Sequence, residues 1–179
     1  MHSLLAFSRG VDWLNAKFGV VADWLVLIAC LISAGNATSR YLISLSSNAW
    51  LEVQWYLFSG MFLLGASYTL KMNEHVRVDL VYANVTDRGR LWIDMFGLVF
   101  FLLPAMAMLA WMTWPFFLDA WLRQEISANA GGLIRWPVKI LMPVGFALIT
   151  AQGVSELIKR IAALQGTITL ETKYDKPLQ

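Results

Sequence analysis

Four long stretches of the chain carry no charged side chain, and they limit the folds that it can adopt. They cover residues 24–39, 53–70, 95–118 and 140–155. A helix needs about 20 apolar residues to cross a hydrocarbon core about 30 Å thick, and the flanks of each stretch can supply the remainder. Unpaired backbone groups are costly in lipid, and these stretches are too long for barrel strands. The sequence therefore predicts four transmembrane helices, over about residues 18–41, 51–71, 91–118 and 137–160.

The overall composition favours the same class of protein. Of the 179 residues, 58% are hydrophobic and only 15% are charged, whereas soluble domains have about 25% charged residues. This composition excludes a disordered chain and a nucleic-acid-binding protein, because both need more polar surface. The four spans also leave no room for a globular catalytic domain. We therefore predict an all-α membrane protein that is not an enzyme.

The distribution of lysine and arginine predicts the orientation of the spans. Ten of the 14 basic residues fall on one side of the four predicted helices. The side that is richer in lysine and arginine is normally cytoplasmic, so both termini are expected in the cytoplasm. The ten residues are Arg9, Lys17, Lys71, Arg77, Arg88, Arg90, Lys159, Arg160, Lys173 and Lys176.

Three segments outside the spans have recognisable patterns. In residues 1–17, apolar side chains recur every three or four positions between polar ones, which predicts an amphipathic helix in the membrane interface. Residues 18–163 form the predicted membrane domain, and residues 164–179 a polar cytoplasmic tail. Between the third and fourth spans, residues 119–125 continue a helical pattern that Asn129 to Gly132 interrupt with turn-forming residues.

Several kinds of chemistry have no matching residues in the sequence. The two histidines, His2 and His75, both lie outside the predicted spans, so a haem buried in the bundle lacks ligands. Cys30 is the single cysteine, and nucleotide-binding and zinc-protease motifs are absent. We therefore predict no catalytic residue, no substrate-binding residue, no metal site and no cofactor.

Two acidic residues lie near the ends of predicted spans. Glu52 stands at the outer end of the second span, where it is either a proton or cation site or part of an interfacial ion pair with Arg40 or with a partner protein. Asp94 lies about one turn inside the third span, and either Arg90 or another subunit can pair with it. Small residues at four-residue steps in the first and fourth spans allow close helix approach.

Ten residues in a fixed order along the chain resemble the pattern of one transporter family. They are Arg40 and Tyr41 ending the first span, Glu52, Tyr56 and Gly65 in the second, His75, Arg77 and Asp79 in the next segment, and Pro143 and Gly145 in the fourth. Over about residues 9 to 163 the chain resembles the small membrane subunit of tripartite ATP-independent periplasmic (TRAP) transporters. The run from Arg135 to Lys139 resembles the branch that handles mannitol or chloroaromatic compounds.

The resemblance implies a role in a bacterial inner (plasma) membrane complex. In such systems a periplasmic solute-binding protein captures an organic acid or related solute, and a large multi-helix membrane subunit imports it with sodium. The small four-helix permease subunit then scaffolds the large subunit and helps to dock the binding protein. Its partners are those two proteins and membrane lipids, with no nucleic acid. The ten residues above and Asp94 are then subunit-interface or architectural positions.

Two other functions compete with this interpretation. The first is a self-sufficient four-helix exporter that couples transport to protons through Glu52. The second is a membrane anchor for a redox enzyme, which the scarcity of histidine disfavours. Transport by this chain alone would distinguish the exporter from the scaffold.

Overall fold

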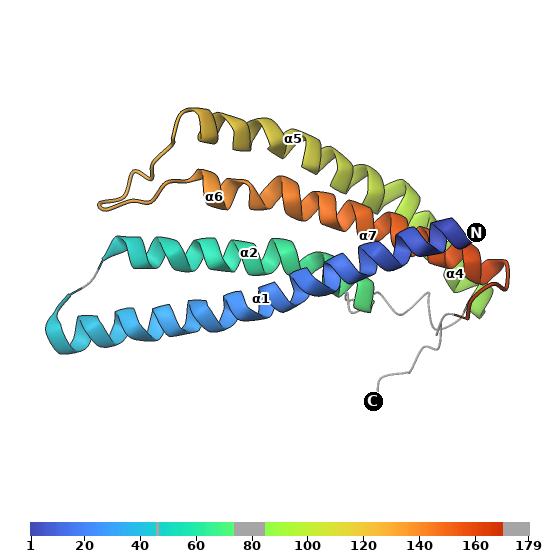
Figure 1. The fold of residues 1–179 in the computed structure, drawn as a ribbon, viewed down its shortest axis with the longest axis horizontal. Helices are drawn as coiled ribbons and strands as arrows, with labels where there is room; N and C mark the ends of the chain where they lie inside the picture. The colour runs from blue at the N-terminus through green and yellow to red at the C-terminus, as the bar shows by residue number, and fades with distance from the viewer. Residues whose placement is uncertain (46, 74–84, 170–179) are drawn as a thin grey trace.

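The computed structural model describes residues 1–45, 47–73 and 85–169, and helices dominate all three ranges. Long helical rods lie side by side in an elongated bundle (Figure 1). Their elements are α1 (His2–Ile43), α2 (Asn48–Met72), α4 (Asp87–Gly97), the π-helical turn η1 (Leu98–Leu102), α5 (Leu103–Leu122), α6 (Trp136–Lys139) and α7 (Leu141–Leu164). The described part of the chain has no strand beyond one isolated bridge between Ile126 and Ile134.

Three helical runs are long and apolar enough to cross a membrane. They are His2–Ile43, Asp87–Leu122 and Trp136–Leu164, and they contain the first, third and fourth predicted spans. The 25 residues of α2 give a length of about 37 Å, which is sufficient for a span. Its composition is more polar, however, and it buries Glu52 and Ser67 inside the bundle. A span over residues 51–71 therefore stays a prediction.

The first helix is longer than predicted. Instead of a separate interfacial helix over residues 1–17, α1 continues without a break for 42 residues, because no proline interrupts the helical hydrogen bonds in this region. At 1.5 Å per residue this is about 63 Å, roughly twice the thickness of a hydrocarbon core. Part of α1 must therefore lie beyond a single membrane crossing.

Two predicted architectural positions bring helices close together at α2. Gly145 of α7 is buried, and a Cβ atom added to it would lie 2.8 Å from the backbone oxygen of Leu63. An added Cβ at Gly65 would lie 3.3 Å from the Cβ of Ala22 in α1. Pro143, two residues before Gly145, is also buried. Small residues at these positions let α1 and α7 approach α2 from two sides.

The arrangement gives the bundle two distinct ends. At one end lie the N-terminal part of α1, α4 and the C-terminal part of α7 (Figure 1). At the other end lie the connections from α1 to α2 and from α5 to α6. Each end holds a cluster of hydrogen-bonded polar side chains.

Candidate functional site

The first cluster, which we call the Glu52 cluster, joins α2 to the connection between α5 and α6. Glu52 is only 3% exposed. One carboxylate oxygen accepts hydrogen bonds from the hydroxyl of Ser127 and, at 2.6 Å, from the amide of Asn129. The other accepts from the backbone N–H of Leu133 at 2.8 Å. A single carboxylate thus fastens three positions of one loop, residues 123–135.

The loop has internal structure that presents these donors together. The backbone N–H of Ser127 donates to Leu133 at 2.9 Å, and that of Gly132 donates to Asn129 at 2.9 Å. Gly131 has φ +72°, a conformation that side chains disfavour. This confirms the turn expected at residues 129–132. Tyr56, one turn after Glu52, donates from its hydroxyl to the carbonyl of Ile134 at 3.2 Å.

A second carboxylate closes the base of the loop. Glu125 contacts the guanidinium of Arg135 at 3.3 Å and the ammonium of Lys139. The hydrogen bond from Lys139, followed by its charge and the contact with Arg135, keeps the pKa of Glu125 below its ordinary value despite some desolvation. Lys139 also lies 3.8 Å from the ring centre of Phe116 in α5. The loop ends are therefore held to both adjoining helices.

The predicted ion pair between Glu52 and Arg40 is wrong. The carboxylate of Glu52 instead accepts its hydrogen bonds from Ser127, Asn129 and Leu133 of the loop. The helix that carries it, α2, lies between α1 and α6 (Figure 1). Arg40 lies in the last turn of α1, and the neighbouring Tyr41 is 91% exposed. The structure therefore brings Glu52 and Tyr56 together and leaves Arg40 and Tyr41 at a separate surface.

The second cluster, which we call the Arg160 cluster, lies at the opposite end of the bundle. Arg160 of α7 contacts Asp94 of α4 at 3.0 Å and Glu156 at 2.6 Å. Lys159 contacts Glu156 at 2.7 Å and Asp12 of α1 at 2.8 Å. Three carboxylates and two cations thus connect three helices. Of these residues, only Asp94 was singled out from the sequence, with Arg90 or another subunit as its expected partner. In the structure Asp94 pairs with Arg160 of α7.

Neutral polar side chains extend the Arg160 cluster along α1 and α7. Asn15 donates to Gln152 at 2.7 Å, Gln152 donates to Asp12 at 2.9 Å, and the hydroxyls of Ser8 and Ser155 lie 2.7 Å apart. Ser8, Asn15, Gln152 and Ser155 are buried, although the sequence pattern predicted that the polar side of residues 1–17 faces away from the membrane.

A signal for this contact is present in the sequence. Ser8, Asp12 and Asn15 recur at helical spacing, and so do Gln152, Ser155 and Lys159. Two polar stripes of this kind can pair with each other instead of with water. Meanwhile Leu4 and Phe7, on the apolar side of the same segment, remain exposed.

The remaining predicted residues belong to neither cluster. Gly65, Pro143 and Gly145 lie at or near helix contacts, as described above. His75, Arg77 and Asp79 lie outside the described residues. Within residues 1–45, 47–73 and 85–169, no group of three or more His, Cys, Asp or Glu side chains is placed to hold a metal ion.

The arrangement defines a helical membrane protein whose polar side chains fasten its own helices and one loop. The sequence model of the DctQ component of tripartite ATP-independent periplasmic transporters matches residues 28–163. The chain therefore belongs to this family of transporter components, which is not a family of enzymes. No curated protein and no solved structure matches the chain.

Proposed function

We propose that the chain is the small permease subunit of a sodium-coupled TRAP transporter in the bacterial inner membrane, with four spans and cytoplasmic termini. It scaffolds the large membrane subunit and helps to dock the periplasmic solute-binding protein. The solute is an organic acid or related compound of the mannitol/chloroaromatic branch. Family membership supports the role as a transporter component, and the excess of lysine and arginine on one side supports the orientation.

The main support for the docking role comes from the Glu52 cluster. It holds loop 123–135 at the end of the bundle that faces the periplasm in this orientation. The loop exposes two apolar side chains on either side of its bridge, Ile126 at 62% and Ile134 at 44%. Exposed apolar groups on a fastened loop suit a protein partner, because little conformational entropy is lost when they are covered.

Docking can be tested by removing one of these side chains. Ile126→Ser in the complete three-component system is expected to weaken binding of the solute-binding protein and slow uptake, while copurification with the large subunit stays unchanged. Leu42→Ser is the matched control, since Leu42 is 76% exposed at the same end of the bundle but on α1. Equal effects of the two substitutions, or none from Ile126→Ser, would contradict the docking role.

Asp23 supports the scaffold role. It lies in the predicted first span, it is exposed, and among the described residues it has neither a hydrogen bond nor an ion pair. A carboxylate that faces lipid is costly, and such residues usually pair with another group. A cationic or hydrogen-bonding group of the large subunit would satisfy it.

The scaffold role predicts a specific loss on charge reversal. Asp23→Lys should reduce copurification with the large subunit, whereas Arg123→Glu, at an exposed site on the periplasmic side, should not. Unchanged copurification of the Asp23→Lys protein would count against this contact. Uptake by the chain alone in proteoliposomes would contradict the scaffold role and favour the self-sufficient exporter.

A further inference from the structure

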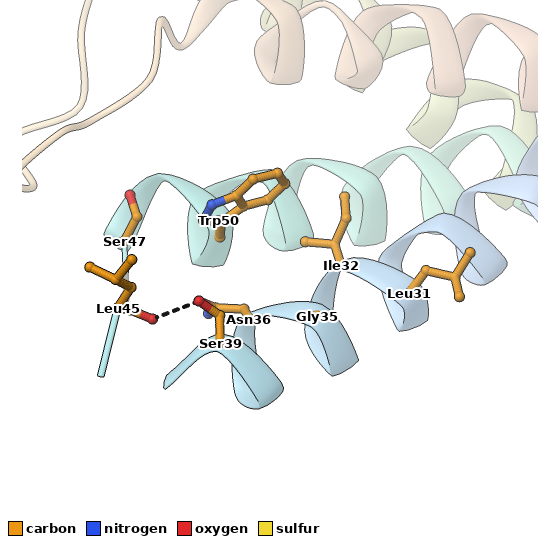
Figure 2. Close-up of a pocket in the computed structure, with 8 residues that line it drawn as sticks. All are labelled: Leu31, Ile32, Gly35, Asn36, Ser39, Leu45, Ser47 and Trp50. Carbon is orange, nitrogen blue, oxygen red and sulfur yellow. Dashed lines mark hydrogen bonds between the residues drawn. The ribbon is translucent and has the colours of Figure 1, made fainter. Parts of the chain in front are cut away.

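A groove between the end of α1 and the start of α2 has no role in the function proposed above. Its volume is about 590 Å³, within the usual range of sites for small ligands, roughly 300–1,000 Å³. Figure 2 shows the lining side chains on facing parts of the two helices and the short connection between them. The groove lies within one chain, so a ligand could enter it before any other subunit assembles.

The lining of the groove changes in character along its length. Leu31 and Ile32 line its inner part, and Trp50 of α2 lies alongside (Figure 2). Toward the connection, the lining contains the polar side chains of Asn36, Ser39 and Ser47 beside Leu45, and the hydroxyl of Ser39 donates to the carbonyl of Leu45 at 3.2 Å. An apolar part that ends in hydrogen-bonding groups matches a molecule with a hydrocarbon chain and a polar head.

The polar part of the groove favours a negatively charged head group. Ser47 is the N-cap of α2, where the first backbone N–H groups of the helix create a positive partial charge. Arg40 follows Ser39 in the last turn of α1, so this end of the helix also carries one positively charged side chain. All of the side chains that line the groove are uncharged, so no carboxylate in the lining repels an anion.

We propose that this groove binds one membrane phospholipid. An acyl chain lies along Leu31 and Ile32 beside Trp50, and the phosphate lies at the polar part near Ser39 and Ser47. In the proposed orientation the lipid comes from the outer leaflet. Trp50 suits this depth, because its ring has an apolar body and one N–H donor and prefers the membrane–water interface.

Gly35 provides a direct test. It lines the groove, and a Cβ atom added there meets nothing within 4 Å, so Gly35→Leu fills the space without a backbone clash. Gly97→Leu is the matched control, since an added Cβ at Gly97 also meets nothing within 4 Å, on a different helix. Both full-length variants are purified in mild detergent, alone and with the large subunit, and their bound lipids are measured by native mass spectrometry.

We expect the wild-type and Gly97→Leu proteins to retain one phospholipid and Gly35→Leu to lose at least about four-fifths of it, a fivefold change that corresponds to roughly 1 kcal/mol. Equal lipid retention in all three proteins overturns the proposal. So does a Gly35→Leu protein that keeps the lipid but loses the large subunit, because a protein segment would then occupy the groove.

A second measurement keeps the proposal testable if Gly35→Leu fails to fold. The wild-type chain is placed in vesicles of phosphatidylethanolamine and phosphatidylglycerol that contain a phospholipid with a photoreactive acyl chain. Labelling of residues 31–50 is expected to exceed labelling of the exposed surface of α5, which serves as the internal control. Equal or weaker labelling of residues 31–50 overturns the proposal.

Discussion

The two polar clusters lie at opposite ends of the same bundle and use their charges differently. In the Arg160 cluster, carboxylates from three helices pair with two cations of α7. The contacts of Lys159 with Asp12 and of Arg160 with Asp94 join residues far apart in the sequence. In the Glu52 cluster, one carboxylate of α2 accepts hydrogen bonds from neutral donors of a loop. The first cluster fixes how helices pack, whereas the second fixes how a loop is displayed.

The difference predicts distinct effects of substitutions in the two clusters. A charge that loses its partner inside packed helices has no access to water, so its loss lowers the free energy of unfolding of the whole bundle. A loop that loses its anchor can open locally while the helices stay folded. Substitutions in the Arg160 cluster should therefore lower global stability, and substitutions in the Glu52 cluster should change only the loop and its interactions.

The largest effect is expected from Arg160→Ala. Arg160 is 8% exposed, and its loss leaves the carboxylates of Asp94 and Glu156 without this cation. Removing one partner of a buried ion pair costs about 3–5 kcal/mol. The free energy of unfolding of the full-length protein in detergent, measured by titration with a denaturing detergent, checks this value.

Arg123→Ala is the control for that substitution. Arg123 also pairs with an aspartate, Asp119, but the side chains are 77% and 54% exposed. An exposed pair contributes at most about 1 kcal/mol. If Arg160→Ala destabilises the bundle no more than Arg123→Ala does, the Arg160 cluster does not hold the helices together.

Much of the fold follows from the sequence, because lipid leaves few choices for an apolar chain. Three of the predicted spans coincide with helices that are long and apolar enough to cross a membrane. The end of the amphipathic segment could not be predicted, since periodicity indicates which side of a helix is apolar but not where one helix stops. Gly10 and Gly19 fall inside α1 without interrupting it.

The candidate site was only partly predictable. Glu52 and Asp94 stand out because acidic residues are rare in apolar segments, and both indeed belong to clusters. Their partners could not be read from the sequence, because Ser127 and Arg160 are distant in the chain and only packing brings them near. Glu52 and Arg40 are only 12 positions apart, but the carboxylate of Glu52 bonds to a loop more than 70 residues further along the chain.

Glu52→Gln should open the loop without unfolding the bundle. The amide keeps one acceptor oxygen but replaces the other with a donor, so some donors of Ser127, Asn129 and Leu133 lose their acceptor. We expect amide hydrogen exchange in residues 123–135 to accelerate on the order of tenfold, with exchange in α7 unchanged. Asp119→Asn, beside the loop, is the control and should leave loop exchange unaltered. Faster exchange in α7 as well would mean that the two clusters are not independent.

Tyr56→Phe should produce a smaller change of the same kind. It removes one neutral hydrogen bond, from the hydroxyl of Tyr56 to the carbonyl of Ile134, and leaves the three bonds of Glu52 in place. Loss of such a bond typically accelerates local opening about threefold. The same exchange measurement checks this, with Tyr41→Phe as the control because Tyr41 is exposed at the end of α1. An effect equal to that of Glu52→Gln would show that Tyr56 is the main anchor of the loop.

The smallest effect is expected from acid, through Glu125. Its pKa in the folded protein is lowered from the ordinary value of 4.5, mainly by the hydrogen bond from Lys139. A carboxyl with a lowered pKa stabilises the folded loop while it is ionised, and this contribution disappears as the pH falls below about 4.5 and through the folded pKa. Loop exchange, corrected for the intrinsic pH dependence of amide exchange, should therefore accelerate in acid in the wild type. In Glu125→Gln, which cannot titrate, this part of the acceleration should be absent. The effect is small because Glu125 is partly exposed, and an identical pH profile in both proteins would assign the acid sensitivity of the loop to another group.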